Sequence, residues 1–289
     1  MPLTPTGPNA EQIRFWNEVN AQKWIRFQSV IDEQIGSLGR VAMDRAGIRA
    51  GERALDVGCG CGGTTLEIAR RVGPAGFVVG IDLSAPMLAE AERRARESHV
   101  SNARFQNSDA QTHAFAPGEF DVGFSRFGVM FFADPARAFA NLGGALRSGG
   151  RFALVCWQAL DRNPWMGVPV RAAAREIPFP APSDPQAPGP FAFADPDRVR
   201  RILTDAGFRD IAIDPHEQVL SIGGRGGIDA AVEFLVQMGP TGAALRQADP
   251  SVEPRVRAAV KEAVAPFLGA DGVKMPSAAW IIFALRPLP

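Results

Sequence analysis

The chain has 289 residues, of which 46% are hydrophobic and 21% charged, and its 31 basic residues balance 31 acidic ones. This size and balance predict a globular protein with a sizeable core, and zero net charge argues against broad attraction to nucleic acid or anionic membranes. No apolar run reaches the roughly 18 residues of a membrane helix, and no signal-peptide pattern opens the chain, so we expect a cytoplasmic protein.

The first part of the chain predicts a tail followed by helices. Residues 1–9 hold three prolines and are expected to form a mobile tail. From 10 to 46, apolar side chains recur at spacings of three and four residues, which is typical of helices. This segment precedes the first predicted strand and is therefore an addition to the core.

The most informative stretch begins at Ala54, where an apolar strand runs into a loop with Gly58, Gly60 and Gly62. Asp56 stands just before these glycines. Glycine lets the backbone turn sharply and lets a ligand approach the main chain. The helix predicted after the loop offers unpaired N–H groups to an anion. The stretch therefore predicts a ligand-binding loop.

The glycine spacing alone allows two interpretations. Gly58, Gly60 and Gly63 also satisfy the dinucleotide fingerprint G-x-G-x-x-G, which leaves an NAD(P)-dependent oxidoreductase open. Asp56 argues against it, because an acid beside the loop would repel a pyrophosphate. The same acid suits a cationic group, such as the amino group or sulfonium of S-adenosylmethionine. The chain also has no tyrosine, so no Tyr-x-x-x-Lys pair is possible.

Further strands are predicted along the chain, alternating with helices. Residues 77–82 form an apolar run that ends in Asp82, 20 residues after Gly62, about where an acid reaches ribose hydroxyls in a nucleotide fold. Strands are also expected at 105–110, 120–125, 152–157, 211–213 and 279–285. Alternating strands and helices predict an α/β fold with a parallel sheet covered on both faces.

In this order the motifs resemble the class I S-adenosylmethionine-dependent methyltransferases over residues 40–158. The resemblance is to the small-molecule branch that includes quinone-biosynthesis and natural-product enzymes. It implies a Rossmann-like, seven-stranded and mostly parallel sheet whose last strand is antiparallel. It also implies S-adenosyl-L-methionine as cofactor, S-adenosyl-L-homocysteine as its product, and these cofactor-binding residues: Asp56, Gly58, Cys59, Gly60, Gly62, Asp82, Leu83, Met87, Asp109, Ala110 and Ser125.

The same resemblance implies a small-molecule acceptor, with no nucleic-acid or membrane partner. Its apolar pocket is expected at the carboxyl ends of the strands, where open α/β sheets bind ligands. His113, four residues after Asp109, is the candidate general base, with a loop histidine as the alternative. Met87 and the N-terminal tryptophans could equally be core residues. The candidate pocket residues are Trp16, Trp24, Phe127, Met130, Phe131, Trp157 and Trp165.

The domain boundaries follow from these elements. We expect a helical lid at 10–46, the cofactor-binding core at 47–158 and an acceptor-side insert at 159–194. Six prolines between residues 177 and 191 of that insert predict a stiff, extended loop, because proline fixes φ and removes an N–H donor. Residues 195–289 complete the core and carry a helical insert at 228–268, which the resemblance places in the lid.

The three cysteines, Cys59, Cys61 and Cys156, favour a reducing compartment, because the number is small and odd. Cys59 and Cys61 have no second ligand cluster nearby, so we expect no metal site. A cofactor-binding protein without catalysis, or a methyltransferase acting on a macromolecule, also stays open. The sequence does not indicate the acceptor atom or the oligomeric state.

Overall fold

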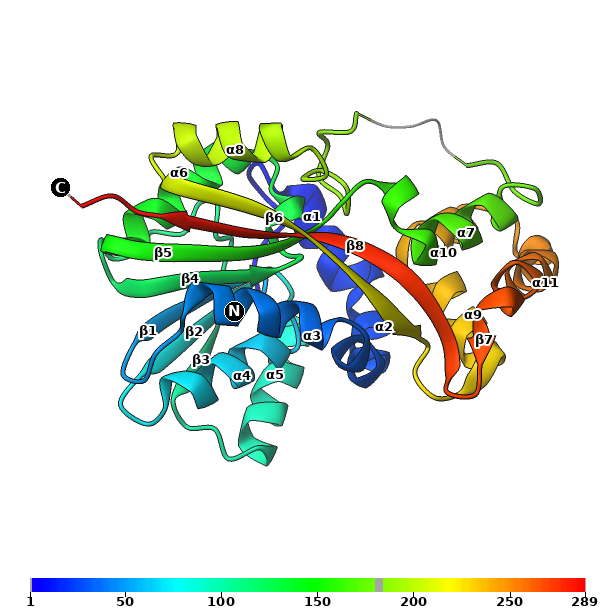
Figure 1. Ribbon diagram of the computed structural model, residues 1–289, viewed down its shortest axis with the longest axis horizontal. Coiled ribbons are helices and arrows are strands. Elements are labelled where there is room, and N and C mark those ends of the chain that lie inside the picture. Colours follow the sequence, from blue (N-terminus) through cyan, green and yellow to red (C-terminus); the bar gives the residue numbers. More distant parts are fainter. Residues whose placement is uncertain (1, 180–183, 289) are drawn as a thin grey trace.

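A single mixed sheet organises the computed structural model, which describes residues 2–179 and 184–288 (Figure 1). Its main path runs β3-β2-β1-β4-β5-β8-β6, and the short β7 pairs with β8 off this path. β8 is antiparallel to both neighbours, whereas the ladders from β3 to β5 are parallel. The predicted sheet is confirmed. The strands are β1 (Arg53–Val57), β2 (Phe77–Asp82), β3 (Ala103–Asn107), β4 (Phe120–Arg126), β5 (Leu146–Trp157), β6 (Arg209–Ile222), β7 (Leu268–Gly269) and β8 (Gly272–Leu285).

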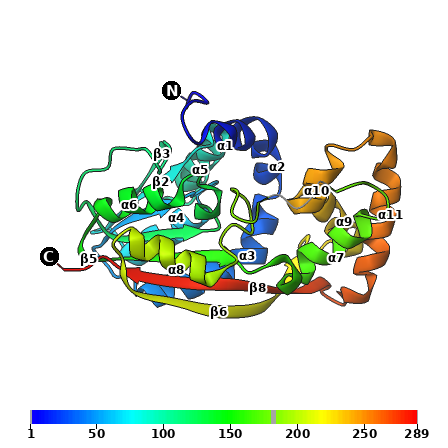
Figure 2. The same cartoon turned by 90° about the horizontal axis from the view of Figure 1, so that it is seen from above.

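Helices cover both faces of this sheet (Figures 1 and 2). α3 (Gln28–Ala46), α4 (Gly63–Val72) and α5 (Ala85–Glu97) pack on one face, and α6 (Pro135–Ala145) and α8 (Pro196–Asp205) on the other. Their starts follow local signals. The side chains of Ser84, Asp134 and Asp195 each accept a backbone N–H in the first turn of the following helix, which also begins with proline.

The N-terminal segment is helical but broken into pieces. α1 (Ala10–Arg14), a π-helical turn (Phe15–Val19) and α2 (Ala21–Arg26) precede the long α3. Two residues of the tail expected at 1–9 contact the rest of the chain. The Leu3 amide donates to Asn107 Oδ1 at 2.9 Å, and Asn9 is buried against the residues after β3.

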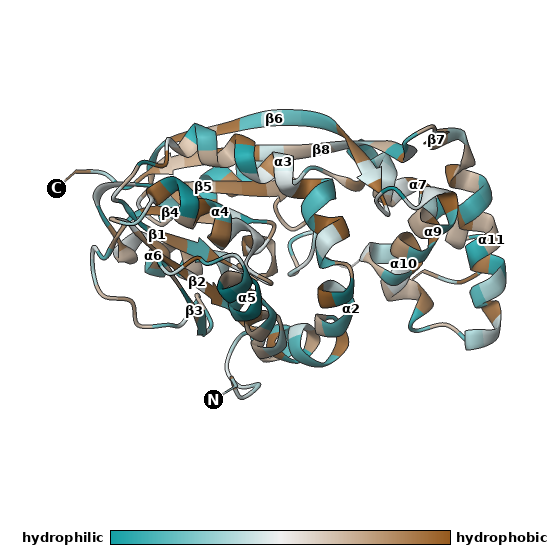
Figure 3. Ribbon diagram, turned by 90° about the horizontal axis from the view of Figure 1, so that it is seen from below, coloured by the Kyte–Doolittle hydropathy of each residue, from teal (hydrophilic) through white to brown (hydrophobic). Residues whose placement is uncertain are grey.

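The C-terminal strands are much longer than predicted. β6 and β8 pair along their whole lengths and extend beyond the rest of the sheet (Figure 1). There they meet a cluster of four packed helices: α7 (Pro164–Ala173), α9 (Gly227–Gln237), α10 (Gly239–Leu245) and α11 (Glu253–Val264). β6 is an edge strand with many hydrophilic residues (Figure 3), so its apolar pattern is weak.

The remaining differences are local. The predicted strand at 105–110 ends at Asn107, so Asp109 lies in the following loop. β5 begins at Leu146, before the predicted start at 152, and its pairing with β4 is irregular near residues 148–150. Pro180 and Pro182 of the predicted stiff loop fall outside the described residues. Single 3-10 turns occur at Val129–Phe131, Leu160–Arg162, Pro250–Val252 and Ala265–Phe267. None of the helices that the structure describes could span a membrane.

Candidate functional site

The loop after β1 is held in a shape that requires glycine. Gly58, Gly60 and Gly62 all have positive φ, between 54° and 79°. The amide of Gly58 donates to the carbonyl of Ile81 at 2.8 Å, which ties the loop to β2. A Cβ on Gly58 would lie 2.8 Å from the Cα of Gly128, after β4. The loop is therefore packed backbone against backbone, with no space for a side chain there.

Asp82, at the carboxyl end of β2, fixes the middle of this loop. Its two carboxylate oxygens accept the Gly60 and Ser84 amides, each at 2.8 Å. Burial raises the pKa of Asp82, and these backbone donors partly oppose the shift. Each carboxylate oxygen can accept two hydrogen bonds, so capacity for hydroxyl donors of a ligand remains.

Asp56 lies behind the loop instead of facing a ligand. It is fully buried, and one carboxylate oxygen accepts the hydroxyls of Thr64 and Thr65, each at 2.6 Å. The other oxygen has no partner among the described residues. The first turn of α4 folds back over this acid, and Asp56 does not line the cavity described below, so it supports the loop. Its predicted contact with a cationic ligand group stays a prediction.

Two other predicted contacts also lie behind the loop. The Ser125 hydroxyl donates to the carbonyl of Val57 at 2.7 Å and so joins β4 to β1. Gly62 is the N-cap of α4, where a Cβ would lie 2.9 Å from Cβ of Ala91. Neither residue lines the cavity described below.

The buried Asp56 gives a pH prediction. Burial raises the pKa of its carboxyl from 3.8 to about 6 in the folded chain. The folded state thus binds this proton more tightly than the unfolded chain. Below about pH 4 the Asp56 carboxyl is protonated in both states and its ionisation does not lower the free energy of unfolding. Once the pH has risen through about 6, its ionisation lowers that free energy by up to about 3 kcal/mol.

We therefore expect Asp56→Asn, which cannot ionise, to gain stability relative to the wild type between pH 4 and pH 7. Chemical denaturation of both proteins across this range measures the difference in their free energies of unfolding. A difference that does not change with pH would show that Asp56 stays charged in the folded protein.

A cavity of about 480 Å³ opens at the carboxyl ends of the parallel strands. The glycine loop, Asp82 and the loop after β3 form one side, and aromatic side chains form the other. All seven predicted pocket residues line it, as do eight predicted cofactor residues. These residues are Trp16, Trp24, Phe127, Met130, Phe131, Trp157 and Trp165, with Gly58, Cys59, Gly60, Asp82, Leu83, Met87, Asp109 and Ala110. Their contacts with a ligand stay predictions.

The aromatic wall comes from two parts of the chain. Phe127 and Trp157, from the ends of β4 and β5, stack at 4.0 Å between ring centroids and 13° between planes. Trp165 of α7 lies 5.3 Å from Trp157. Opposite, Trp16 contacts both Trp24 and Phe131 edge to face. The N-terminal helices thus contribute directly to the wall of the cavity.

His113 does not face the cavity. Its ring lies 3.0 Å from Gln106 Nε2 and packs edge to face on Phe115 at 4.6 Å. Partial burial lowers the pKa of the imidazole. The chain turns after Asp109 and carries His113 away from the strand ends, so the structure gives no support to its predicted role as general base.

Several site residues were not predicted. Asn9 is 1% exposed and donates its amide to both carboxylate oxygens of Asp109 at 2.9 Å. The backbone N–H of Gln111 also donates to the Asp109 carboxylate, so residues of the chain itself occupy much of its hydrogen-bonding capacity. Asn9 carries no sequence signal, because it stands in a proline-bearing segment. The close approach of Gly128 to the glycine loop is likewise a tertiary contact.

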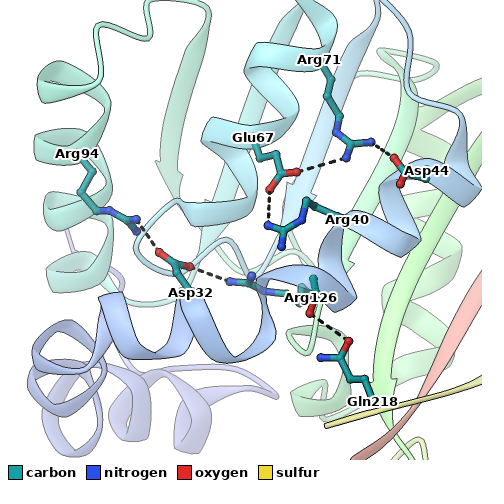
Figure 4. A network of polar contacts seen from close by, with 9 residues as sticks. Asp32, Arg40, Asp44, Glu67, Arg71, Arg94, Arg126 and Gln218 are labelled. Carbon is teal, nitrogen blue, oxygen red and sulfur yellow. Dashed lines mark hydrogen bonds and ion pairs between the residues drawn. The ribbon is translucent and has the colours of Figure 1, made fainter. Parts of the chain in front are cut away.

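A network of ion pairs fixes α3 to the site (Figure 4). Asp32 of α3 pairs with Arg94 of α5 at 2.6 Å and with Arg126, at the end of β4, at 3.3 Å. Burial alone would raise the pKa of Asp32, but the two arginines and Gln28 outweigh it and lower the pKa. Arg94 also donates to the carbonyl of Cys61 in the glycine loop. This network joins the N-terminal helices to the loop.

Comparisons with known proteins show what this core is similar to. Residues 54–150 match the family model of a methyltransferase domain. Aklanonic acid methyltransferase DauC of Streptomyces sp. (strain C5) is 36% identical over 116 residues, which cover 40% of this chain and 53% of that protein. Nocamycin O-methyltransferase of Saccharothrix syringae is 35% identical over 40% of this chain and 42% of its own length. The chain thus spans about half the length of these curated relatives.

Longer but weaker similarities extend beyond the core. A demethylmenaquinone methyltransferase of Staphylococcus saprophyticus is 26% identical over 66% of this chain and 85% of its own length. Among solved structures, YcgJ from Bacillus subtilis superimposes with a TM-score of 0.58 at 18% identity, covering 87% of this chain and 98% of that one. That similarity shows the fold. Residues 54–150 therefore match a methyltransferase domain, and relatives that are methyltransferases by name share this core.

Proposed function

We propose that this protein transfers a methyl group from S-adenosylmethionine to a small-molecule acceptor. The observation that carries the proposal is that one cavity joins two unlike halves. The glycine loop and Asp82 form a polar half, and stacked aromatic rings form an apolar half. The match to a methyltransferase domain and the methyltransferase names of two relatives support the same proposal.

The polar half fits the donor. Asp82 has acceptor capacity left for two ribose hydroxyls, and its carboxylate is held rigidly by two backbone amides. Met87, which also lines the cavity, packs against Gly60, because a Cβ on Gly60 would lie 2.9 Å from Cε of Met87. Bound S-adenosylmethionine would supply a methyl group already activated on its sulfonium.

The apolar half would hold the acceptor and exclude water. Phe127, Trp157 and Trp165 offer flat surfaces, and rings stack favourably on such surfaces. Holding both partners in one dry cavity lowers the barrier through orientation alone. These residues therefore contribute by positioning.

We also propose that the protein is cytoplasmic, a proposal supported by its three free, buried cysteines.

We further propose that the N-terminal helices act as a lid. Asn17 joins them to the loop after β2, because its side chain accepts the Ala85 amide and donates to the Leu83 carbonyl, both at 3.0 Å. Trp16 and Trp24 line the cavity beside this clamp. A cofactor beneath them would add contacts that the free protein lacks.

Hydrogen exchange of residues 10–30 should therefore slow when S-adenosylhomocysteine binds. Mass spectrometry with and without the ligand measures this, and α8, on the opposite face of the sheet, serves as internal control. Equal exchange of residues 10–30 in both samples would contradict a lid.

The activity itself can be tested before the acceptor is known. The protein would be incubated with methyl-labelled S-adenosylmethionine and small-molecule extracts, and the products separated by chromatography. We expect label in a small molecule, with heat-denatured protein as control. Label recovered only in protein or nucleic acid would contradict a small-molecule acceptor.

A further inference from the structure

We infer that the acceptor is a flat, mostly apolar molecule with at least two oxygen substituents, recognised by Trp165, Gln28 and Gln34. The inference rests on the proposed function and adds the substrate class. It comes from three residues that line the cavity, each of which holds one buried polar atom without a partner among the described residues: Trp165 Nε1, Gln28 Oε1 and Gln34 Oε1.

These groups are unusual because buried polar atoms in proteins are nearly always paired. Trp165 is 8% exposed, Gln28 6% and Gln34 3%. Leaving such groups dry and unpaired costs free energy, which a ligand that completes their hydrogen bonds would recover. Three such groups around one cavity indicate a ligand with matching polar positions.

The positions of the three groups define the ligand's shape. Gln28 and Gln34 share one face of α3 with Ile31 and Ile35, which also line the cavity. Trp165 comes from α7, next to the stacked pair of Phe127 and Trp157. The polar groups are thus set in an apolar and aromatic wall, which suits a ring carrying substituents.

The chemistry of each group defines the substituents. An indole N–H can only donate, so Trp165 requires an acceptor such as a carbonyl oxygen. The side-chain carbonyls of Gln28 and Gln34 require a donor such as a hydroxyl. Hydrogen bonding of the Gln28 side chain to Asp32 contributes to the lowered pKa of that acid, so its amide N–H group is already engaged. A ring with one carbonyl oxygen and one hydroxyl satisfies Trp165 and one of the two glutamines, and a second hydroxyl would satisfy the other.

The test uses 7-hydroxycoumarin, a flat ring system with a lactone carbonyl as acceptor and a hydroxyl as donor, and naphthalene, a flat ring system with neither. Calorimetry would measure both affinities, with and without S-adenosylhomocysteine. We expect the wild type to bind 7-hydroxycoumarin at least about tenfold more tightly. Trp165→Phe and Gln34→Met keep the apolar bulk, and each should reduce that preference about three- to tenfold while naphthalene affinity stays within about twofold.

Gln12→Met is the matched control. Gln12 also has a buried oxygen without a partner, but it does not line the cavity. This variant should bind both rings as the wild type does. Equal affinity of the wild type for the two rings, or an unchanged preference in both cavity variants, would overturn the inference. Failure of S-adenosylhomocysteine to bind would instead overturn the proposed function, since the rings are also compared without it.

Discussion

Asp82→Ala is expected to weaken binding of S-adenosylhomocysteine at least tenfold. The carboxylate should accept two charge-assisted hydrogen bonds from ribose hydroxyls, each worth about 1.5–3 kcal/mol. Every 1.4 kcal/mol changes the dissociation constant tenfold, so loss of one bond already reaches that limit. Calorimetric titration of the folded variant measures the effect.

The control for this variant is Asp121→Ala. Asp121, at the start of β4, also holds a backbone amide, since its carboxylate accepts the Arg53 N–H at 2.8 Å. It does not line the cavity. Both variants should lose some thermal stability, but only Asp82→Ala should lose ligand affinity. An unchanged dissociation constant in folded Asp82→Ala would remove Asp82 from the donor site.

Gly58→Ala is expected to destabilise the fold by about 2–5 kcal/mol and to abolish ligand binding. Two costs add up. The φ of Gly58 is 69°, and an L residue pays about 1–2 kcal/mol in this region. The new methyl would also lie 2.8 Å from Cα of Gly128, so backbone must move, at a cost of about 1–3 kcal/mol. Urea denaturation measures the loss of stability.

Gly47→Ala separates the two costs. Gly47, after the end of α3, has a φ of 57° in the left-handed helical region, but nothing lies within 4 Å of the added Cβ. It should therefore lose only the conformational part, about 1–2 kcal/mol, and keep its affinity for S-adenosylhomocysteine. If the two variants were equally stable, the close approach of the two backbones at Gly58 and Gly128 would not contribute to the loss of stability.

The sequence predicted those parts of the fold that depend on short-range signals. The glycine loop and the buried strands around it are confirmed, because neighbouring residues determine them. The lengths of β6 and β8 were wrong. Their outer halves are determined by pairing with each other and by the packed helices, and such contacts leave little local pattern.

The candidate site shows the same division. The pocket aromatics could be predicted, because the strand order brings the ends of β4 and β5 to the same edge as the glycine loop. The positions of Asp56 and His113 could not, since the direction of a side chain depends on the turn that follows it. The partnership of Asn9 with Asp109 spans 100 residues and is visible only in the folded chain.

The most direct measurement is a calorimetric titration of the wild-type protein with S-adenosylhomocysteine and, in parallel, with NAD. Both ligands carry an adenosine, so each could be bound by a glycine loop with an acid after the second strand. The account predicts saturable binding of S-adenosylhomocysteine with one ligand per chain, and no comparable binding of NAD. Tight binding of NAD, with none of S-adenosylhomocysteine, would contradict it.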